Sequence, residues 1–432
     1  MTPITKVDID RLRRKIERIE GGRMQPSETP RQDAEADPGR DPDDYFPERY
    51  ATEDYLDGEE RENAHGKYWV QERLYPNHQR HGSFEISRLA EMPGEWLEKI
   101  SKGELVRKPP ERWAFLDTET TGLSGGTGTC AFLVGVGVIE PEGFRVRLFF
   151  MRDYDEETAM LAGLVEFLED YDVLVTYNGK SYDAPLLETR FRLRRLANPL
   201  ARLQHLDVLH GARSIWKLRM ESCRLSHLEN QVLGVERHGD LPGEMIPYYY
   251  FEYLRKKQAF KLVPLFHHNV IDIVSLACLT GVVLPAFDAP RQAELHHGED
   301  LLGLARWLKR SGANEEAVDV YRRAVDQGMR DPDLFAALWE RALLEKKQKA
   351  FPAMLELLED LAASRNDFQA RAHVELAKYH ERVTKDLPLA LRFAQHAYKL
   401  DPEEPQERRL ARLEKRVAKL EASGKLFAEA RA

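Results

Sequence analysis

Two acidic residues at the end of one apolar segment are the first candidates for chemistry in this 432-residue chain. Asp117 and Glu119 close the sequence WAFLDTET, which has the apolar run typical of a buried strand. Residues two apart in a strand point to the same face, so the two carboxylates converge there. Like charges repel each other when buried, unless a divalent cation lies between them. Carboxylate oxygens suit Mg²⁺ or Mn²⁺, although two ordinary surface acids would have the same spacing.

A second acidic position follows the strand-like segment VLVTY. The sequence NGKSYD places Asn178 in the connection and Asp183 at the start of a predicted helix, APLLETRFRLRRL. Taken alone, Asp183 would be a helix N-cap and Asn178 a turn former.

The third position lies in the apolar helical segment HHNVIDIVSLACLTGVVL. His268 and Asp272 are four residues apart, and such residues share one face of a helix. Alone they would be a surface pair. The joint pattern of a strand with DxE, a strand and helix joined by NxxxxD, and a helix with HxxxD, in that order, indicates one shared metal site.

The elements around these residues alternate between strands and helices. AFLVGVGVIE and FRVRLFFM have the composition of strands, EETAMLAGLVEFLED that of an amphipathic helix, and YDVLVTYNG that of a further strand. This order predicts an α/β fold over residues 111–287, with a mixed sheet flanked by helices.

The residues before this domain fall into three predicted parts. Residues 1–20 have apolar positions at helical spacing and predict a short amphipathic helix. Residues 21–64 are rich in charged residues, Pro and Gly, and predict a disordered acidic linker. Residues 65–110 regain aromatic and aliphatic residues and predict a small strand-containing extension.

The residues after this domain, 298–432, predict an all-α region. The stretches EEAVDVYRRAVDQG, FPAMLELLEDLAAS and LPLALRFAQHAYKLDP align at Ala317, Ala353 and Ala390, with offsets of 36 and 37 residues. Each stretch follows another helical stretch, and paired helices near a period of about 34 are typical of tetratricopeptide repeats. An ordinary helical domain with chance similarity is the alternative.

Composition limits the class of protein. The net charge of −9 shows that the chain is not a bulk polycation, so a surface that binds nucleic acid must be local. The three cysteines form no CxxC pair, which suits a reducing compartment. The first residues are too polar for a signal peptide, and no apolar run reaches the roughly 18 residues that a membrane span needs. We therefore expect a cytoplasmic protein that makes no membrane contact.

The three motifs also resemble those of a known superfamily. DTETTG, NGKSYD and HHNVIDI are similar to the exonuclease motifs of the DnaQ-like DEDD superfamily. LSGGTGTCAFLVGVG, HLENQVLGVER and GEMIPYYYFEYL resemble, more narrowly, the YprB-type ribonuclease-H-like proteins. The resemblance covers about residues 66–287, roughly half of the chain.

The resemblance implies a metal-dependent 3′–5′ exonuclease with a ribonuclease-H-like fold. Two divalent metals, Mg²⁺ or Mn²⁺, would be held by four carboxylates: Asp117, Glu119, Asp183 and Asp272. His268, four residues before Asp272, would deprotonate or orient the attacking water. His267 lies five residues before Asp272, which is the histidine spacing of one subclass, so the choice between the two histidines stays open.

The expected substrate is DNA or RNA. Thr118, Asn178 and Lys180 lie closest in sequence to the acids and are candidate substrate contacts. A basic cluster between the second and third motifs is a candidate phosphate surface, or an ordinary solvated helix face; its members are Arg190, Arg192, Arg194, Arg195, Arg202, Arg213, Lys217, Arg219 and Arg224.

Two other functions remain open at this point. The chain could be a catalytically weak or inactive nucleic-acid-binding or scaffold protein, or a repeat adaptor in which the nuclease fold is incidental. Whichever function holds, the helical repeats would recruit a protein partner through a concave surface, or they would only brace the nuclease domain. The choice of DNA or RNA, the polarity, exo- or endonucleolytic cutting and the oligomeric state are not determined by the sequence.

Overall fold

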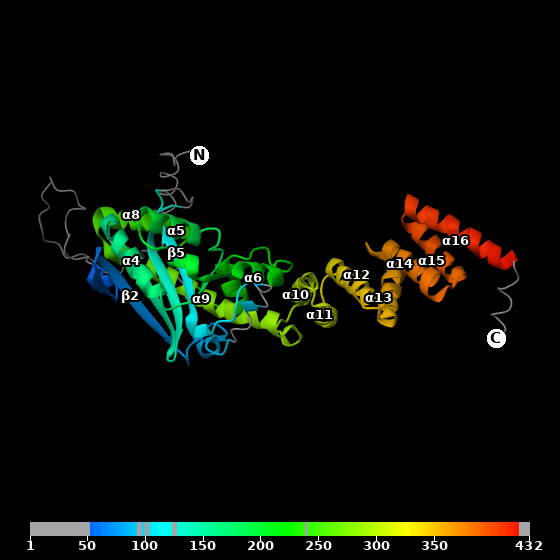
Figure 1. Ribbon diagram of the computed structural model, residues 1–432, viewed down its shortest axis with the longest axis horizontal. Helices are drawn as coiled ribbons and strands as arrows, with labels where there is room; N and C mark the ends of the chain where they lie inside the picture. The colour runs from blue at the N-terminus through cyan, green and yellow to red at the C-terminus, as the bar shows by residue number, and fades with distance from the viewer. Residues whose placement is uncertain are drawn as a thin grey trace, which may run out of the picture. The chain divides into compact units, whose positions relative to one another are not determined.

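The computed structural model describes residues 52–92, 97–98, 101, 104–122, 128–237 and 241–422 (Figure 1). The helix predicted over residues 1–20 lies outside the described residues, as does the part of the predicted linker over residues 21–51.

A seven-stranded mixed sheet forms the centre of the fold, in the order β1-β2-β7-β6-β5-β8-β9. Neighbours from β1 to β5 are antiparallel, whereas β5–β8 and β8–β9 are parallel. This is the mixed sheet that the sequence predicts. The strands are β1 (Glu59–Asn63), β2 (Gly66–Pro76), β5 (Trp113–Thr120), β6 (Ala131–Glu140), β7 (Gly143–Phe150), β8 (Val173–Thr176) and β9 (Gln204–Asp207).

The end of the predicted disordered linker is ordered, which corrects the prediction for residues 21–64. The short helix α2 (Thr52–Tyr55) and strand β1 lie inside that range. Strand β1 reads EEREN and is mostly exposed, but it pairs with β2 at the edge of the sheet. The prediction counted apolar side chains, whereas an edge strand gains its order from backbone pairing and needs few of them.

The predicted N-terminal extension over residues 65–110 is also not a separate preface. Strand β2 pairs with β7 over most of its length, from Trp69 opposite Phe150 to Pro76 opposite Gly143. The first strands of the described chain are therefore part of the main sheet. Two further short strands, β3 (Arg80–His81) and β4 (Phe84–Glu85), form a small hairpin of their own.

Helices cover both faces of the sheet (Figure 1). Phe149 of β7 packs against Phe167 of α4, with ring centres 5.6 Å apart. The next residue, Phe150, points to the other face and packs against Phe266 of α9, with ring centres 5.0 Å apart. The helices of this region are α4 (Glu157–Leu168), α5 (Asp183–Leu193), α6 (Val208–Trp216), α7 (Leu225–Leu228), α8 (Ile246–Lys256) and α9 (Val263–Asp288).

Helix α9 is a core helix despite its membrane-like composition. The helical stretch Ala259–Asp288 is long enough to cross a membrane, and its most apolar window of 18 residues has a mean hydropathy of 2.2. This corrects the expectation that no apolar run reaches about 18 residues, although His, Asn and Asp residues lie within the stretch. In the structure 78% of its most apolar window is buried, and α9 packs against β5, β6 and β7.

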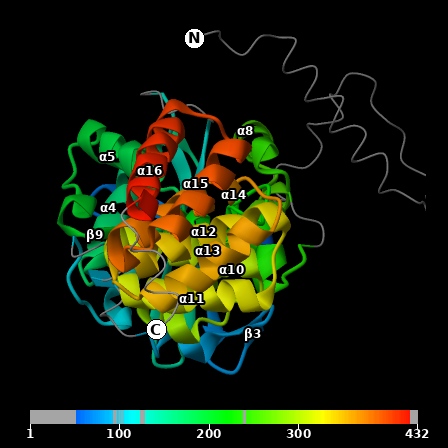
Figure 2. The same ribbon diagram turned by 90° about the vertical axis from the view of Figure 1, so that its right-hand side faces the viewer.

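The C-terminal region is all helical, as predicted. Its helices are α10 (Gly298–Ser311), α11 (Asn314–Gln327), α12 (Asp331–Lys347), α13 (Phe351–Ala363), α14 (Gln369–Tyr379), α15 (Leu387–Leu400) and α16 (Glu404–Ala422). Consecutive helices pack in pairs, α10 with α11, α12 with α13, and α14 with α15 (Figure 2). The likeness to tetratricopeptide repeats stays a prediction.

The helical region shares a hydrophobic core with the sheet only at its start. Buried residues of α10 and α11, such as Leu302 and Tyr321, belong to the same core as the sheet. Helices α12–α14 and α14–α16 enclose two smaller cores of their own. At the junction, Gly303 of α10 lies so close to α6 that a Cβ atom would come within 2.3 Å of the Ser214 carbonyl oxygen.

Candidate active site

The acidic end of β5 faces helix α9. Asp117 stands opposite Gly135 of β6 in the antiparallel register. Gly135 lies directly against α9, because a Cβ atom there would come within 2.1 Å of Asn269 Oδ1. Residues paired across strands, and residues two apart in one strand, share a face of the sheet. Asp117 and Glu119 therefore both lie on the face that α9 covers.

Polar side chains of α9 meet these acids. The side-chain amide of Asn269 donates a hydrogen bond to Asp117 Oδ2 at 2.8 Å. Nε2 of His268 lies 3.4 Å from Oδ2 of Asp272, one helical turn away. Ligand atoms of Glu119, His268 and Asp272 all lie within 4.8 Å of one another, which is close enough to hold a metal ion.

Asp183 is the first residue of α5, so this helix determines where its carboxylate lies. The hydroxyl of Thr118 donates to Asp183 Oδ1 at 2.5 Å and so ties the start of α5 to β5. The turn before α5 is tight, since Asn178 has a left-handed φ of 67°. Gly179 allows this turn, because a Cβ atom there would come within 2.5 Å of Thr176 Cβ.

Asp207, the last residue of β9, holds the same turn in place. Its carboxylate accepts hydrogen bonds from the backbone N–H groups of Asn178 at 2.8 Å and Lys180 at 3.2 Å. It also accepts from the N–H of Leu209 at 3.1 Å and thereby caps the start of α6. Asp207 thus supports the site through the backbone and couples the second motif to α6.

Burial and mutual repulsion raise the pKa of the clustered carboxyls. Burial raises the pKa of Asp117 well above its ordinary value, and the charges of Asp272, Asp183 and Glu119 raise it further. Burial raises the pKa of Glu119 to about 8, opposed by His268 and reinforced by Asp272. Burial likewise raises the pKa of Asp183 to about 6. Four carboxyls in such surroundings are a fitting donor set for hard divalent cations, which stabilise the ionised forms.

Arg237 supplies one positive charge at the edge of this cluster. Its guanidinium donates to Asp272 and makes a bidentate pair with Glu229, with N–O distances of 2.6 and 2.8 Å. Glu229 is only 1% exposed and also accepts from the Ser275 hydroxyl at 2.5 Å. A buried carboxylate persists only when it is paired, so Glu229 holds Arg237 against Asp272.

Asn269, Arg237 and Glu229 were not among the predicted site residues. Asn269 had a signal, because it lies three residues before Asp272 and three apart is also one helix face. Arg237 and Glu229 both lie in HLENQVLGVER, which resembles the YprB-type proteins, but no spacing indicated that they meet the acids. They come from the irregular segment around a π-helix, Glu229–Leu233, whose spacing to the acids appears only in the folded chain.

The other predicted site residues lie as follows. His267 is exposed, whereas His268 is partly buried and lies beside Asp272. Thr118 uses its hydroxyl on Asp183. Lys180, within the second motif, is exposed, and Asn178 lines a hollow.

The predicted basic cluster is not one surface. Three of its arginines make ion pairs, and a fourth donates to backbone carbonyls: Arg190 and Arg194 bind the buried Glu157, Arg219 binds Asp300, and Arg202 binds the carbonyls of Leu168 and Tyr171. These four have structural partners. Another three, Arg213, Lys217 and Arg224, line the hollow beside Asn178.

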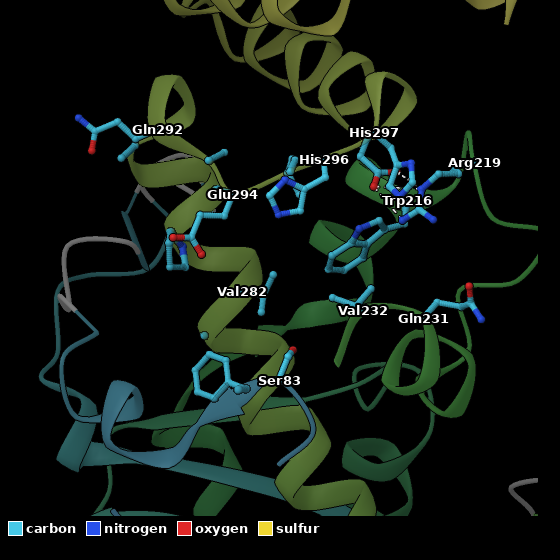
Figure 3. A pocket seen from close by; sticks show the side chains of 18 of the residues that line it. Ser83, Trp216, Arg219, Gln231, Val232, Val282, Gln292, Glu294, His296 and His297 are labelled. Carbon is cyan, nitrogen blue, oxygen red and sulfur yellow. Dashed lines mark hydrogen bonds and ion pairs between the residues drawn. The ribbon is translucent and has the colours of Figure 1, made fainter. Parts of the chain in front are cut away.

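A second hollow, of about 600 Å³, lies between α6, α9 and the segment leading into α10 (Figure 3). Trp216, Arg219 and His297 lie close together at one side of it, and His296 lies between this group and Glu294 in this view. None of the predicted carboxylates lines it, and Arg219 there is paired with Asp300 at 2.8 Å.

Comparison with known proteins gives three findings. Residues 114–283 match the RNase H superfamily (RNase_H_2). The chain is 32% identical over 361 residues to the uncharacterized protein YprB of Bacillus subtilis (strain 168), a match that covers 81% of this chain and 85% of that protein. A family B DNA polymerase from the hyperthermophilic archaeon Pyrobaculum calidifontis matches 48% of this chain and 30% of its own, with 17% identity and a TM-score of 0.32.

The mixed sheet, its acidic central strand and the match over residues 114–283 place this domain in the RNase H superfamily. Within that class the chain belongs to the family of YprB, since the identity extends over most of both chains. Membership of this superfamily supports a nuclease-like function with nucleic acid as the substrate. The cluster of Glu119, His268 and Asp272 is where the structure offers a site for divalent metal.

Proposed function

We propose that the chain is a metal-dependent 3′–5′ exonuclease that hydrolyses the terminal phosphodiester of a nucleic acid by a two-metal mechanism. The observation that carries this proposal is the cluster of acids at the meeting of β5, α5 and α9. Ligand atoms of Glu119, His268 and Asp272 lie within 4.8 Å of one another, and Thr118 beside them binds Asp183. A fold gains nothing in stability by burying like charges together, so the cluster is best explained by a cation that it binds.

The proposal assigns a task to each side chain. Asp117, Glu119, Asp183 and Asp272 would hold two divalent metals, which activate water and stabilise the leaving oxygen of a phosphodiester. Thr118 and Asn269 orient two of these carboxylates through the hydrogen bonds described above. His268, next to Asp272, would take the proton of the attacking water.

The test is release of nucleotides from end-labelled DNA and RNA, single- and double-stranded, in the presence of Mn²⁺. We expect Asp183→Asn and Asp272→Asn each to lower the rate by more than about 100-fold. Losing a group that only supports a metal ligand lowers activity by about 10- to 100-fold, and losing a ligand itself should exceed this. Labels at the 3′ and at the 5′ end separate the two polarities.

The matched control is Asp326→Asn, which makes the same chemical change at an exposed position of α11. It should cut at the wild-type rate. Binding without release by the wild-type chain would favour the alternative of a nucleic-acid-binding protein without turnover. Near-wild-type release by Asp183→Asn or Asp272→Asn would remove that residue from the site.

A further inference from the structure

A hollow of about 590 Å³ lies beside the second motif. One wall is the turn after β8, with Tyr177 and Asn178, and the other is α6 with the segment that follows it. Three basic residues line it, Arg213, Lys217 and Arg224, and we call it the basic hollow. Arg213 and Lys217 are four residues apart, so they share one face of α6.

The cations of the basic hollow are not used for structure. Within the part of the chain that the structure describes, no carboxylate lies within ion-pair distance of any of the three. Other arginines of the same sequence segment, such as Arg190 and Arg219, bind buried carboxylates. The described lining holds one acid, Glu221, against three cations, so the hollow is positive on a chain whose net charge is −9.

The basic hollow adjoins the carboxylate cluster through one short segment. Asn178 lines the hollow, and Asp183 lies five residues further along the chain. Five residues span at most about 18 Å, even fully extended. Successive phosphates of a duplex strand advance by about 3.4 Å, so a strand that ends at the carboxylates has several phosphates within this distance.

Both ends of α6 are held, so the basic hollow is preformed. The Asp207 carboxylate caps the start of α6 and bonds the Asn178 N–H. Near its other end, Gly303 of α10 packs against the backbone carbonyls of α6. A rigid arrangement of positive charge loses little entropy when it binds a chain of phosphates.

We propose that Arg213, Lys217 and Arg224 form a binding site for the backbone phosphates of the nucleic acid whose end lies at the carboxylates. This inference rests on the proposed function and adds how the substrate is held. Contacts to phosphates carry charge and no base sequence, so the site gives affinity without sequence preference.

The first experiment measures binding without turnover. Full-length protein in EDTA is titrated into a fluorescently labelled single-stranded oligonucleotide over a range of salt concentrations. The variant Arg213→Ala/Lys217→Ala/Arg224→Ala should bind about tenfold more weakly at low salt. Its slope of log affinity against log salt should fall by about 2, because each phosphate contact to a single strand contributes about 0.7.

The second experiment separates binding from chemistry. With Mn²⁺, the triple variant should show a raised KM and an unchanged kcat, because its residues contact the substrate away from the reacting bond. The variant Arg213→Lys/Arg224→Lys keeps all three charges and should keep the wild-type salt slope. The control Arg371→Ala/Arg392→Ala/Lys415→Ala removes three exposed charges of the helical region and should keep both the affinity and the slope.

The outcomes are distinguishable. If the triple variant matches the control in affinity and slope while the wild type binds and cuts, the basic hollow is not a phosphate site and the proposed function stands. A fall in kcat at unchanged KM would also overturn the inference. If the wild type neither binds an oligonucleotide nor releases nucleotides, the proposed function itself fails.

Discussion

At the scale of residues, the acids of this site are held by neutral donors as well as by charge. The Asn269 amide donates to Asp117 and the Thr118 hydroxyl donates to Asp183, so two carboxylates are oriented before any metal binds. Asp272 is instead held by Arg237, which Glu229 anchors from the core. A positive charge beside Asp272 lowers the repulsion within the cluster, and it also competes with any cation that Asp272 binds.

The raised pKa of Glu119 predicts how stability depends on pH without metal. Folding raises this pKa from 4.5 to about 8, so between these values the folded chain binds more protons than the unfolded chain. Stability therefore falls as pH rises through this window. Buried histidines have the opposite effect on stability. Burial lowers the pKa of His205 from 6.5 to about 4, so this residue makes stability rise with pH, but only below pH 6.5.

The measurement is urea unfolding in EDTA from about pH 6.5 to 8. We expect the free energy of unfolding to fall over this range in the wild type. Glu119→Gln should remove much of this fall in the free energy of unfolding, because the glutamine side chain does not titrate. Saturating Mn²⁺ should reverse it, since the metal binds the ionised carboxylates of the folded state. A free energy that is flat or rises in EDTA would contradict the assignment.

At the scale of elements, the close approach of β6 to α9 positions the site. Gly135 leaves room for Asn269, whose Oδ1 lies 2.1 Å from where a Cβ atom would stand. Both glycines leave room for Ile273, and Gly137, two residues on, leaves room for Phe144 where Gly135 leaves room for Asn269. The two glycines thus allow the same packing of helix on sheet, but only one of them adjoins a site residue.

Gly135→Ala and Gly137→Ala form a matched pair of substitutions. Each should lower the free energy of unfolding by about 1–3 kcal/mol, because an extra methyl group overpacks the interface. Gly135→Ala should also lower the nuclease rate by about 10- to 100-fold, since it displaces the Asn269 amide from Asp117. Urea unfolding and nucleotide release measure the two effects. Equal losses of rate in both variants would show that Asn269 has no special role.

At the scale of the whole molecule, the helical region has two parts, which differ in the hydrophobic core to which they belong. Helices α10 and α11 share the hydrophobic core of the sheet, and Arg219 binds the buried Asp300 across the junction at 2.8 Å. Helices α12–α16 enclose two cores of their own, although α12 also contributes Ala337 and Leu344 to the core of the sheet. Helices α10 and α11 therefore complete the core of the RNase-H-like domain, whereas binding of a protein partner by the later helices stays a prediction.

Two truncations test this division. A chain that ends at Gln348 keeps α10–α12, so it should fold and retain nuclease activity on short oligonucleotides. A chain that ends at His297 uncovers the apolar face on which α10 packs, so it should aggregate or melt at lower temperature. Thermal unfolding and nucleotide release distinguish them. If the chain that ends at His297 melted at the wild-type temperature, the shared core would not contribute to the stability of the sheet domain.

Local sequence determined the elements and the motifs. The apolar run before Asp117 makes a strand, its alternation puts Glu119 on the same face, and the spacing of four puts His268 beside Asp272. These features depend on periods of two and of about 3.6 residues, which any reader of the chain can count. The mixed sheet and the all-α region follow from the order of such elements.

Only the tertiary structure decided which distant residues meet. Arg237 reaches Asp272 because a buried Glu229 holds it, and no spacing in the chain indicates that contact. The basic cluster likewise looked uniform in sequence, but folding paired Arg219 with Asp300 and left Arg213 lining a hollow. The physical reason is that the role of a charged side chain depends on the partner beside it. Partners far apart in the chain are brought together by packing and not by local pattern.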